Sequence, residues 1–287
     1  MKNGIGADIL NRLELAKELS AIENGELKAE SGQGLIFAIT GSPGVGKSCM
    51  IDALLHHLTP KNKVAILAVD PTSPLSGGAL LGDRVRMSVL DDNEKADSIY
   101  LRSIATRSSS GSIPSIVRDL STHLLARDFD MVLVETVGAG QSEVRCAAIA
   151  DRIILVEGPG RGDGIQAEKA GLLELADLIV VNKSDLEGAD KVVNHLKISL
   201  SIGDNPPPIM KVSSLLGDGI EDLSNKLASM PQRVGSIRAR MRQRLLMSHE
   251  SQITANPDFE SVIDRMAQEG LGVEEALEEL QLVNKLR

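Results

Sequence analysis

Eight residues in the N-terminal part of the chain have the types and spacing of a phosphate-binding loop. The segment GSPGVGKS, residues 41–48, fills every position of the pattern G-x-x-x-x-G-K-[ST]. Its glycines let backbone N–H groups turn toward phosphate oxygens, and a following helix adds the partial positive charge of its N-terminus. Lys47 would reach the β- and γ-phosphates, and Ser48 would bind Mg²⁺. The residues predicted to contact a nucleotide here are Gly41, Pro43, Gly44, Val45, Gly46, Lys47, Ser48 and Cys49.

A second motif predicts which base the nucleotide carries. Asn182, Lys183 and Asp185 form the pattern N-K-x-D at the end of the apolar run LIVVNK. The Asp185 carboxylate can accept two hydrogen bonds from guanine, one from N1–H and one from the exocyclic amine, and adenine presents no such pair of donors. Lys183 would lay its aliphatic stem over the ring. The chain is therefore expected to bind GTP and GDP. The residues expected to close over the base are Ser213, Ser214 and Leu215.

Acidic residues that follow apolar runs are candidates for a Mg²⁺ site. Mg²⁺ prefers octahedral oxygen ligands, keeps several waters and is held by few direct protein contacts. The three candidates are Asp70, Asp83 and Glu135, and Glu135 ends the run MVLVE that most resembles a Walker B strand. Gly138 would offer its backbone N–H to the γ-phosphate. Gln141 would orient a water, although a solvated glutamine is an equally simple interpretation of this residue.

The elements that must position these residues follow from alternating apolar runs and helical patterns. Short apolar runs recur from residue 35 onward, and longer stretches with helical periodicity separate them. Near-continuous apolar strands between helices predict a mostly parallel, twisted sheet of about seven strands with helices on both faces, an α/β fold of the P-loop type. The predicted strands are residues 35–40, 64–69, 98–103, 129–135, 152–157, 178–183 and 208–213.

Helical extensions are expected on both sides of this sheet. The predicted organisation is a helical lead-in at residues 1–33, a P-loop domain at 34–228 and a C-terminal helical arm at 229–287. Apolar residues recur at helical spacing over residues 8–30. The arm starts with a basic amphipathic stretch, whose arginines from Arg233 to Arg244 are expected to form a solvated face or a partner surface. Since the sheet domain leaves such an amphipathic arm unexplained, we expect a homodimer through helix packing.

Composition excludes several functional classes. The formal net charge is −9, and the chain has no Trp, one Tyr and three Phe. It therefore lacks the basic surface and the stacking aromatic residues of general nucleic-acid binders. The sequence contains no apolar run of 18 residues and no signal-like N-terminus, so we expect a soluble, cytoplasmic protein with no membrane contact. Cys49 and Cys146 form no metal-spaced set, which suits a reducing compartment.

Taken together, the motifs resemble the ArgK/MeaB family of GTPases. The resemblance covers roughly residues 10–230, and its segments are 41–48, 68–87, 100–112, 129–144 and 158–186. Members of that family are SIMIBI-class P-loop proteins that act as chaperones for adenosylcobalamin-dependent acyl-CoA mutases, such as methylmalonyl-CoA mutase. The resemblance implies Mg²⁺-dependent hydrolysis of GTP to GDP and phosphate, a role in cofactor loading and protection, and contact with a mutase and its adenosyltransferase.

The resemblance also implies roles for individual residues. Lys47 and Ser48 match the family's P-loop pair, and Asn182, Lys183 and Asp185 match its guanine reader. The acids that match its Mg²⁺ site are Asp70, Asp83 and Glu135. The segment 158–171 matches an extra mobile loop that couples nucleotide state to the mutase. The residues thereby predicted to take part in catalysis or coupling are Lys47, Asp83, Glu135, Gln141, Asp163, Gln166 and Lys169.

Three departures from the family pattern predict a divergent member. Gly164 and Ile165 stand where relatives carry bulkier acidic character, the run 102–114 lacks a histidine and a glycine pair, and the arm lacks a tryptophan. The alternative function is a GTPase metallochaperone for nickel enzymes of the urease or hydrogenase type, which shares this P-loop branch. It would need cysteine or histidine ligands near the switch segments, and Cys146 follows GQSE without a histidine beside it.

Overall fold

One parallel sheet organises the chain. The computed structural model describes residues 3–59, 61–70, 87–105, 113–136, 142–160, 167–201 and 205–282. Within these ranges, seven strands lie in the order β3-β2-β4-β1-β5-β6-β7, and all their pairings are parallel. The predicted α/β class is therefore confirmed. The strands are β1 (Leu35–Thr40), β2 (Val64–Asp70), β3 (Ile99–Ala105), β4 (Met131–Glu135), β5 (Arg152–Glu157), β6 (Leu178–Val181) and β7 (Ile209–Lys211).

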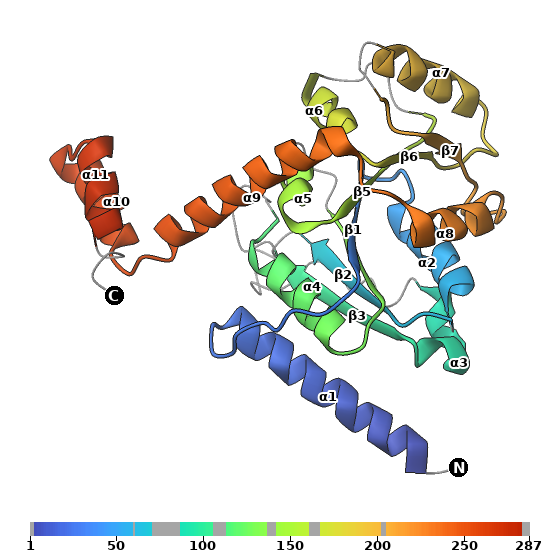
Figure 1. The fold of residues 1–287 in the computed structure, drawn as a ribbon, viewed down its shortest axis with the longest axis horizontal. Coiled ribbons are helices and arrows are strands. Elements are labelled where there is room, and N and C mark those ends of the chain that lie inside the picture. The colour runs from blue at the N-terminus through green and yellow to red at the C-terminus, as the bar shows by residue number, and fades with distance from the viewer. Residues whose placement is uncertain are drawn as a thin grey trace.

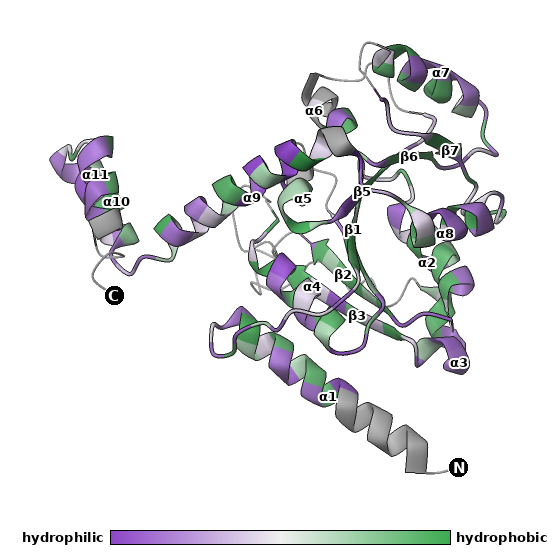
Figure 2. Cartoon of the chain, viewed as in Figure 1, coloured by the Kyte–Doolittle hydropathy of each residue, from purple (hydrophilic) through white to green (hydrophobic). Residues whose placement is uncertain are grey.

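Helices cover both faces of the sheet, which explains why its strands are apolar throughout (Figure 1). On β1, Phe37 and Ile39 face α2 (Lys47–Leu58) and α8 (Ile220–Ser229), while Ile36 and Ala38 face the opposite layer. Figure 2 shows the hydrophobic colour gathered on the strands. The helices of the opposite layer are α1 (Asn3–Glu23), α4 (Ile116–Ala126), α5 (Ser142–Ile149), α6 (Ala167–Leu175), α7 (Ala189–Leu200) and α9 (Val234–Thr254). The remaining elements are η2 (Ser88–Asp91), α3 (Asn93–Ala96), α10 (Phe259–Glu269) and α11 (Val273–Leu282).

Two strands near the edge of the sheet end earlier than the sequence predicts. The apolar runs predict strands that reach residues 183 and 213, whereas β6 ends at Val181 and β7 at Lys211. Lys183 adopts a left-handed backbone conformation, with φ of 58°, which is incompatible with an extended strand. The residues beyond both strands therefore leave the ladder and form loops at the carboxyl edge of the sheet.

The N-terminal helix is shorter at its C-terminal end than predicted. The expectation of helix over residues 8–30 is wrong beyond Glu23, where α1 ends. Gly25 has φ of 76°, its N–H donates to the Ile22 carbonyl, and the Glu26 N–H donates to the Ala21 carbonyl. This pair of bonds is a Schellman motif, which glycine favours because it carries no Cβ in the left-handed region.

An ion-pair cluster fastens α1 to α4. The Arg127 guanidinium contacts both Glu18 and Glu30, and the buried His123 ring also contacts the Glu18 carboxylate. The hydrogen bond from Arg127 holds the pKa of the Glu18 carboxyl below its ordinary value. Leu19 and Ile22 bury the apolar side of α1 beside these charges. The first helix therefore packs on the layer opposite α2.

Aspartates close the amino edge of the sheet. Asp151 precedes β5, donates its N–H to the Ile36 carbonyl and accepts the Ile36 N–H at Oδ2, 3.1 Å away. Asp177 precedes β6 and exchanges the same two bonds with Ile153. Each carboxylate therefore satisfies the first donor of a neighbouring strand, which would otherwise be left without a partner at the end of the ladder.

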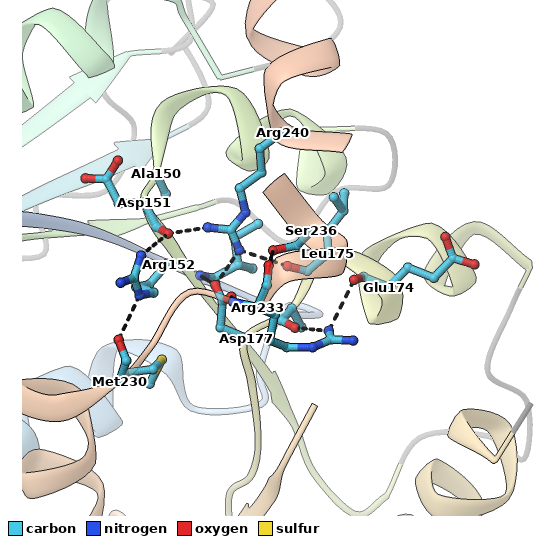
Figure 3. A network of polar contacts seen from close by, with 12 residues as sticks. Ala150, Asp151, Arg152, Glu174, Leu175, Asp177, Met230, Arg233, Ser236 and Arg240 are labelled. Atoms are coloured by element: carbon cyan, nitrogen blue, oxygen red, sulfur yellow. Dashed lines mark hydrogen bonds and ion pairs between the residues drawn. The ribbon is translucent and has the colours of Figure 1, made fainter. Parts of the chain in front are cut away.

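Arginines of α9 bind these aspartates and the carboxyl ends of two helices, and Figure 3 shows the contacts of Arg240. Arg240 is 0% exposed and donates to the Asp177 carboxylate, the Asp151 carbonyl and, at 3.0 Å, the Leu175 carbonyl at the end of α6. Arg244 donates to the carbonyls of Ala148 and Ala150 at the end of α5. Cations at helix carboxyl ends satisfy the last carbonyls and complement the helix dipole. The expectation of a solvated arginine face is therefore wrong for Arg240.

Beyond these contacts, α9 leaves the sheet domain and leads to α10 and α11, which lie apart from it in Figure 1. Val262, Ala276 and Leu280 form a small separate apolar cluster there. None of the helices in the described ranges is both long and apolar enough to span a membrane. These helices fall within the range predicted for the arm, and its role in dimerisation stays a prediction.

We predict that Arg240→Met lowers the free energy of unfolding by about 3–5 kcal/mol, because it leaves the buried Asp177 carboxylate without its cation. Urea unfolding followed by circular dichroism measures this loss. Arg238→Met is the matched control, since Arg238 is exposed on the same helix, and its effect should stay within about 0.5 kcal/mol. Equal losses in the two variants would contradict the anchoring role of Arg240.

Candidate functional site

The predicted nucleotide-binding residues gather at the carboxyl edge of the sheet. The chain moves from β1 toward β2 on one side, and later crosses from β4 over β1 to β5 on the other. The connections thus run in opposite directions from the region of β1, and open α/β sheets bind ligands at the carboxyl ends of the strands at such a point. The P-loop follows β1, Glu135 ends β4, and Asn182 follows β6. The fold therefore brings together residues that lie far apart in the sequence.

Two glycines of the P-loop have no room for a side chain. Gly41 has φ of 141°, and a Cβ there would lie 2.1 Å from the Val156 carbonyl oxygen of β5. Gly46 has φ of 92°, and a Cβ there would lie 2.5 Å from Nδ2 of Asn182. The first glycine allows the loop to pass close over β5, and the second allows the Asn182 amide to reach the loop. Both positions accept glycine alone without displacement of a neighbour.

Lys47 begins α2 and is buried. Its Nζ donates to the Gly41 carbonyl at 2.7 Å and to the Ser42 carbonyl at 3.3 Å. Other P-loop residues differ in exposure: Val45 is buried in the core layer of α2, whereas Pro43, Gly44 and Cys49 are exposed. The structure therefore places the cation against the first residues of the loop, beside the N-terminus of α2.

Hard oxygen ligands lie next to the P-loop on one face of the sheet. The Ser48 hydroxyl donates to Oε1 of the buried Glu135 carboxylate at 2.7 Å. The register pairs Ala68 with Glu135, so the buried Asp70 projects from the same face two residues further along β2. Carboxylate and hydroxyl oxygens in this number fit Mg²⁺, which needs few direct protein ligands. Within the described ranges, no group of three or more His, Cys, Asp and Glu side chains is close enough to hold a metal ion.

The buried Asn182 amide joins the base-reading motif to the P-loop. Its Nδ2 donates to the Val45 carbonyl at 3.0 Å and to the Gly46 carbonyl at 3.3 Å. Its Oδ1 accepts from the N–H of Ser214 at 3.1 Å and from the Ser214 hydroxyl at 2.8 Å. The two amide donors and the amide oxygen all bond to protein, so Asn182 holds the two loops together. Its contact with guanine stays a prediction.

Lys183 and Asp185 extend from this junction. The Lys183 ammonium donates to the Gly44 carbonyl at 2.8 Å, so its stem crosses the outer side of the P-loop. The Asp185 carboxylate is exposed and accepts a hydrogen bond from the Ser213 hydroxyl at 2.5 Å. One face of that carboxylate is thus fixed by Ser213, and the rest remains accessible.

The serines after β7 support the base-reading motif. Ser213 and Ser214 donate hydrogen bonds to Asp185 and Asn182 and hold them in place. Their predicted closure over a base stays a prediction. Leu215 is 86% exposed and contacts neither side chain through a hydrogen bond. The sequence signal for this support is the pair of hydroxyl residues that begins two positions beyond the end of β7, the strand that neighbours β6 in the sheet.

Several predicted residues lie outside the described part of the chain. They are Asp83, Gly138, Gln141, Asp163 and Gln166. The backbone of Lys169 belongs to α6, and its side chain lies outside the described residues. The geometry above therefore concerns the P-loop, the strand-end acids and the base-reading loops.

Comparison with known proteins places this geometry in a family. The family model of the methylmalonyl-CoA mutase-associated GTPase MeaB matches residues 14–270. A protein of Pyrococcus abyssi assigned as a GTPase is 34% identical over 292 aligned positions, which cover 91% of this chain and 89% of that protein. The GTPase ArgK of Escherichia coli is 39% identical over 59% of this chain and 49% of its own.

A solved structure shows the same fold. The crystal structure of a LAO/AO transport system kinase aligns with a TM-score of 0.54 and 24% identity, covering 94% of this chain and 86% of that one. That similarity concerns the fold alone. The P-loop, the N-K-x-D motif and the family match over most of the sequence agree with one another. The chain belongs to the MeaB family and is a GTPase.

Proposed function

We propose that this GTPase binds GTP with Mg²⁺ at the carboxyl edge above β1 and hydrolyses it to GDP and phosphate. The observation that carries this proposal is the Asn182 amide, which joins the base-reading motif to the P-loop through two hydrogen bonds and to Ser214, after β7, through two more. In this arrangement, a nucleotide that fills the P-loop with its phosphates places its base beside Asp185 and Lys183. Base selection and phosphate binding therefore occur in one rigid unit.

The side chains of the site supply binding and positioning. Backbone N–H groups of the P-loop and the Lys47 ammonium would hold the phosphates, which orients the γ-phosphate for in-line attack by water. Ser48 and Glu135, with Asp70 and Asp83, would hold Mg²⁺, which when bound neutralises charge on the β- and γ-oxygens. Gly138 and Gln141 keep their predicted roles beside the γ-phosphate.

Base selectivity follows from the Asp185 carboxylate. It is exposed in this structure, and a bound base would cover it and remove its water. Guanine offsets that desolvation because its two N–H groups donate to the carboxylate. Adenine offers no such pair, so the carboxylate would lose its water without gaining donors, at a cost of roughly several kcal/mol. The bond from Ser213 fixes the carboxylate before the base arrives.

We further propose that nucleotide state controls a partner enzyme, an adenosylcobalamin-dependent acyl-CoA mutase. The support is the description of the matching family, which names an association with methylmalonyl-CoA mutase. Segment 158–171, with Asp163, Gln166 and Lys169, would couple the nucleotide to the mutase or its adenosyltransferase, as the resemblance implies. The arm at 229–287 would join two copies of the chain. Cofactor loading and protection would then follow the GTPase cycle.

We predict that Asp185→Asn weakens GDP and GTP binding at least about tenfold and improves binding of xanthosine nucleotides, since an asparagine amide matches the 2-oxygen of xanthine. Fluorescence titration with labelled GDP and XDP measures both affinities. Asp190→Asn is the matched control, because Asp190 is an exposed acid of α7 that pairs with Lys211 at the end of β7. Unchanged GDP affinity in Asp185→Asn would refute the base assignment.

We predict that the tagged chain captures an acyl-CoA mutase from native lysate, with a recovery that differs between GDP and a non-hydrolysable GTP analogue. Quantitative mass spectrometry measures the recovery, and Lys47→Ala, which should lose the phosphate contact, is the control chain. Recovery of urease or hydrogenase subunits would favour the nickel metallochaperone. Equal recovery of the mutase with GDP and with the GTP analogue would contradict control of a partner by GTP.

A further inference from the structure

Two buried threonine hydroxyls lie at the carboxyl edge of the sheet on the face opposite the Mg²⁺ candidates. Thr40 ends β1 and is 0% exposed, and Thr136 follows β4 and is 2% exposed. Within the described part of the chain, neither Oγ1 atom has a hydrogen-bond partner. A buried hydroxyl left in this state costs about 1–3 kcal/mol, and most such groups in native proteins bind protein or ordered water. These two therefore require an explanation.

The register places the two threonines side by side. Ile39 pairs with Glu135, and the Thr136 N–H donates to the Ile39 carbonyl at 3.0 Å, so Thr40 and Thr136 are the next neighbours along β1 and β4. Side chains alternate along strands, so both share the face of Ala38 and Val134. Neighbouring strands lie about 4.8 Å apart. One water at hydrogen-bond distance, about 2.8 Å from each hydroxyl, spans that separation.

The surroundings of the pair are apolar. Leu155 of β5 pairs with Thr40, and Val69 of β2 is the neighbour of Thr136, one residue beyond the pair of Ala68 with Glu135. Leu155 and Val69 belong to the same buried core layer, and α5 packs against β1 on this face of the sheet. Valine has the shape of threonine and would remove the penalty of the hydroxyls. Packing alone therefore does not account for two hydroxyl groups at these positions.

The two threonines are next in sequence to the P-loop and to Glu135, the two parts of the proposed nucleotide site that must keep a fixed separation. Thr40 directly precedes Gly41, the first residue of the P-loop, and Thr136 directly follows Glu135, which accepts the Ser48 hydrogen bond. A link between the two hydroxyls would fix the end of β1 against the end of β4. The Glu135 carboxylate would then keep its position relative to the P-loop, where displacements of a fraction of an ångström change reaction rates.

We propose that Thr40 and Thr136 form a site for one buried water and act as positioning residues that set Glu135 against the P-loop for GTP hydrolysis. The proposal rests on the proposed nucleotide site and adds to it a pair of residues on the other face of the sheet. The water donates or accepts at each Oγ1, so both hydroxyls gain a partner. Loss of either hydroxyl loosens the same link.

Four single variants and one double variant test this proposal. Thr40→Val and Thr136→Val remove each hydroxyl at constant shape, and Thr40→Ser and Thr136→Ser keep it. We expect each valine variant to lower kcat for GTP at least fivefold, with GDP affinity within twofold of wild type and an unchanged or higher unfolding temperature. The serine variants should keep kcat within twofold. The kcat of the double valine variant should be no lower than that of the slower single valine variant, because one water binds both hydroxyls.

The opposite results overturn the proposal. Valine variants with unchanged kcat would show that the hydroxyls are inert, and multiplied losses in the double variant would show two independent effects. If the valine variants lose GDP affinity and unfolding temperature together with kcat, the two threonines stabilise the fold and do not position Glu135. A failure of GDP binding in the wild-type chain would instead defeat the nucleotide site itself. A crystal structure of the wild-type chain gives a direct second readout, in which density for a water between the two Oγ1 atoms is expected and its lack would overturn the site.

Discussion

The rest of the site depends on one buried amide. Asn182 is 1% exposed and makes hydrogen bonds to the P-loop on one side and to the loop after β7 on the other. In the proposed site the P-loop would hold the phosphates, and the loop after β7 holds the Asp185 carboxylate through Ser213. Because a single side chain spans both loops, the distance between the proposed phosphate-binding and base-reading groups is set before any nucleotide binds. Such preorganisation lowers the entropy cost of binding.

At the amino edge of the sheet, arginines and aspartates hold the first helix of the arm against the sheet domain. Arg240 and Arg244 donate to carbonyls at the carboxyl ends of α6 and α5. Arg244 also binds the Asp151 carboxylate, and Arg240 binds the Asp177 carboxylate. The same two carboxylates accept N–H groups at the start of the neighbouring strands. The amino ends of α5 and α6 follow the segments 137–141 and 161–166, near the carboxyl edge. The helix that begins the arm is thus fastened to the far ends of the two helices that leave the nucleotide side of the sheet.

Much of the fold and part of the site could be predicted from sequence, because they depend on local patterns. Apolar runs gave the strand order along the chain, and the P-loop and N-K-x-D motifs encode their chemistry in consecutive residues. Contacts between distant residues could not be predicted. The Asn182 bond to Val45 spans 137 positions and the Arg240 bond to Asp177 spans 63, and neither leaves a periodic trace. The end of α1 was missed because the Asn24-Gly25 step outweighed the apolar spacing around it.

Calorimetric titration of GDP and ADP into the wild-type chain and into Asn182→Ala, all with Mg²⁺, tests whether this amide sets base selection. The Asn182 amide is hydrogen-bonded to both loops, so its loss should disturb the loops that are proposed to bind the phosphates and the base. We predict that wild type prefers GDP strongly and that the variant loses at least about tenfold in GDP affinity and most of its preference over ADP. A variant that stays folded and keeps the wild-type ratio of GDP to ADP affinity would contradict this role of Asn182.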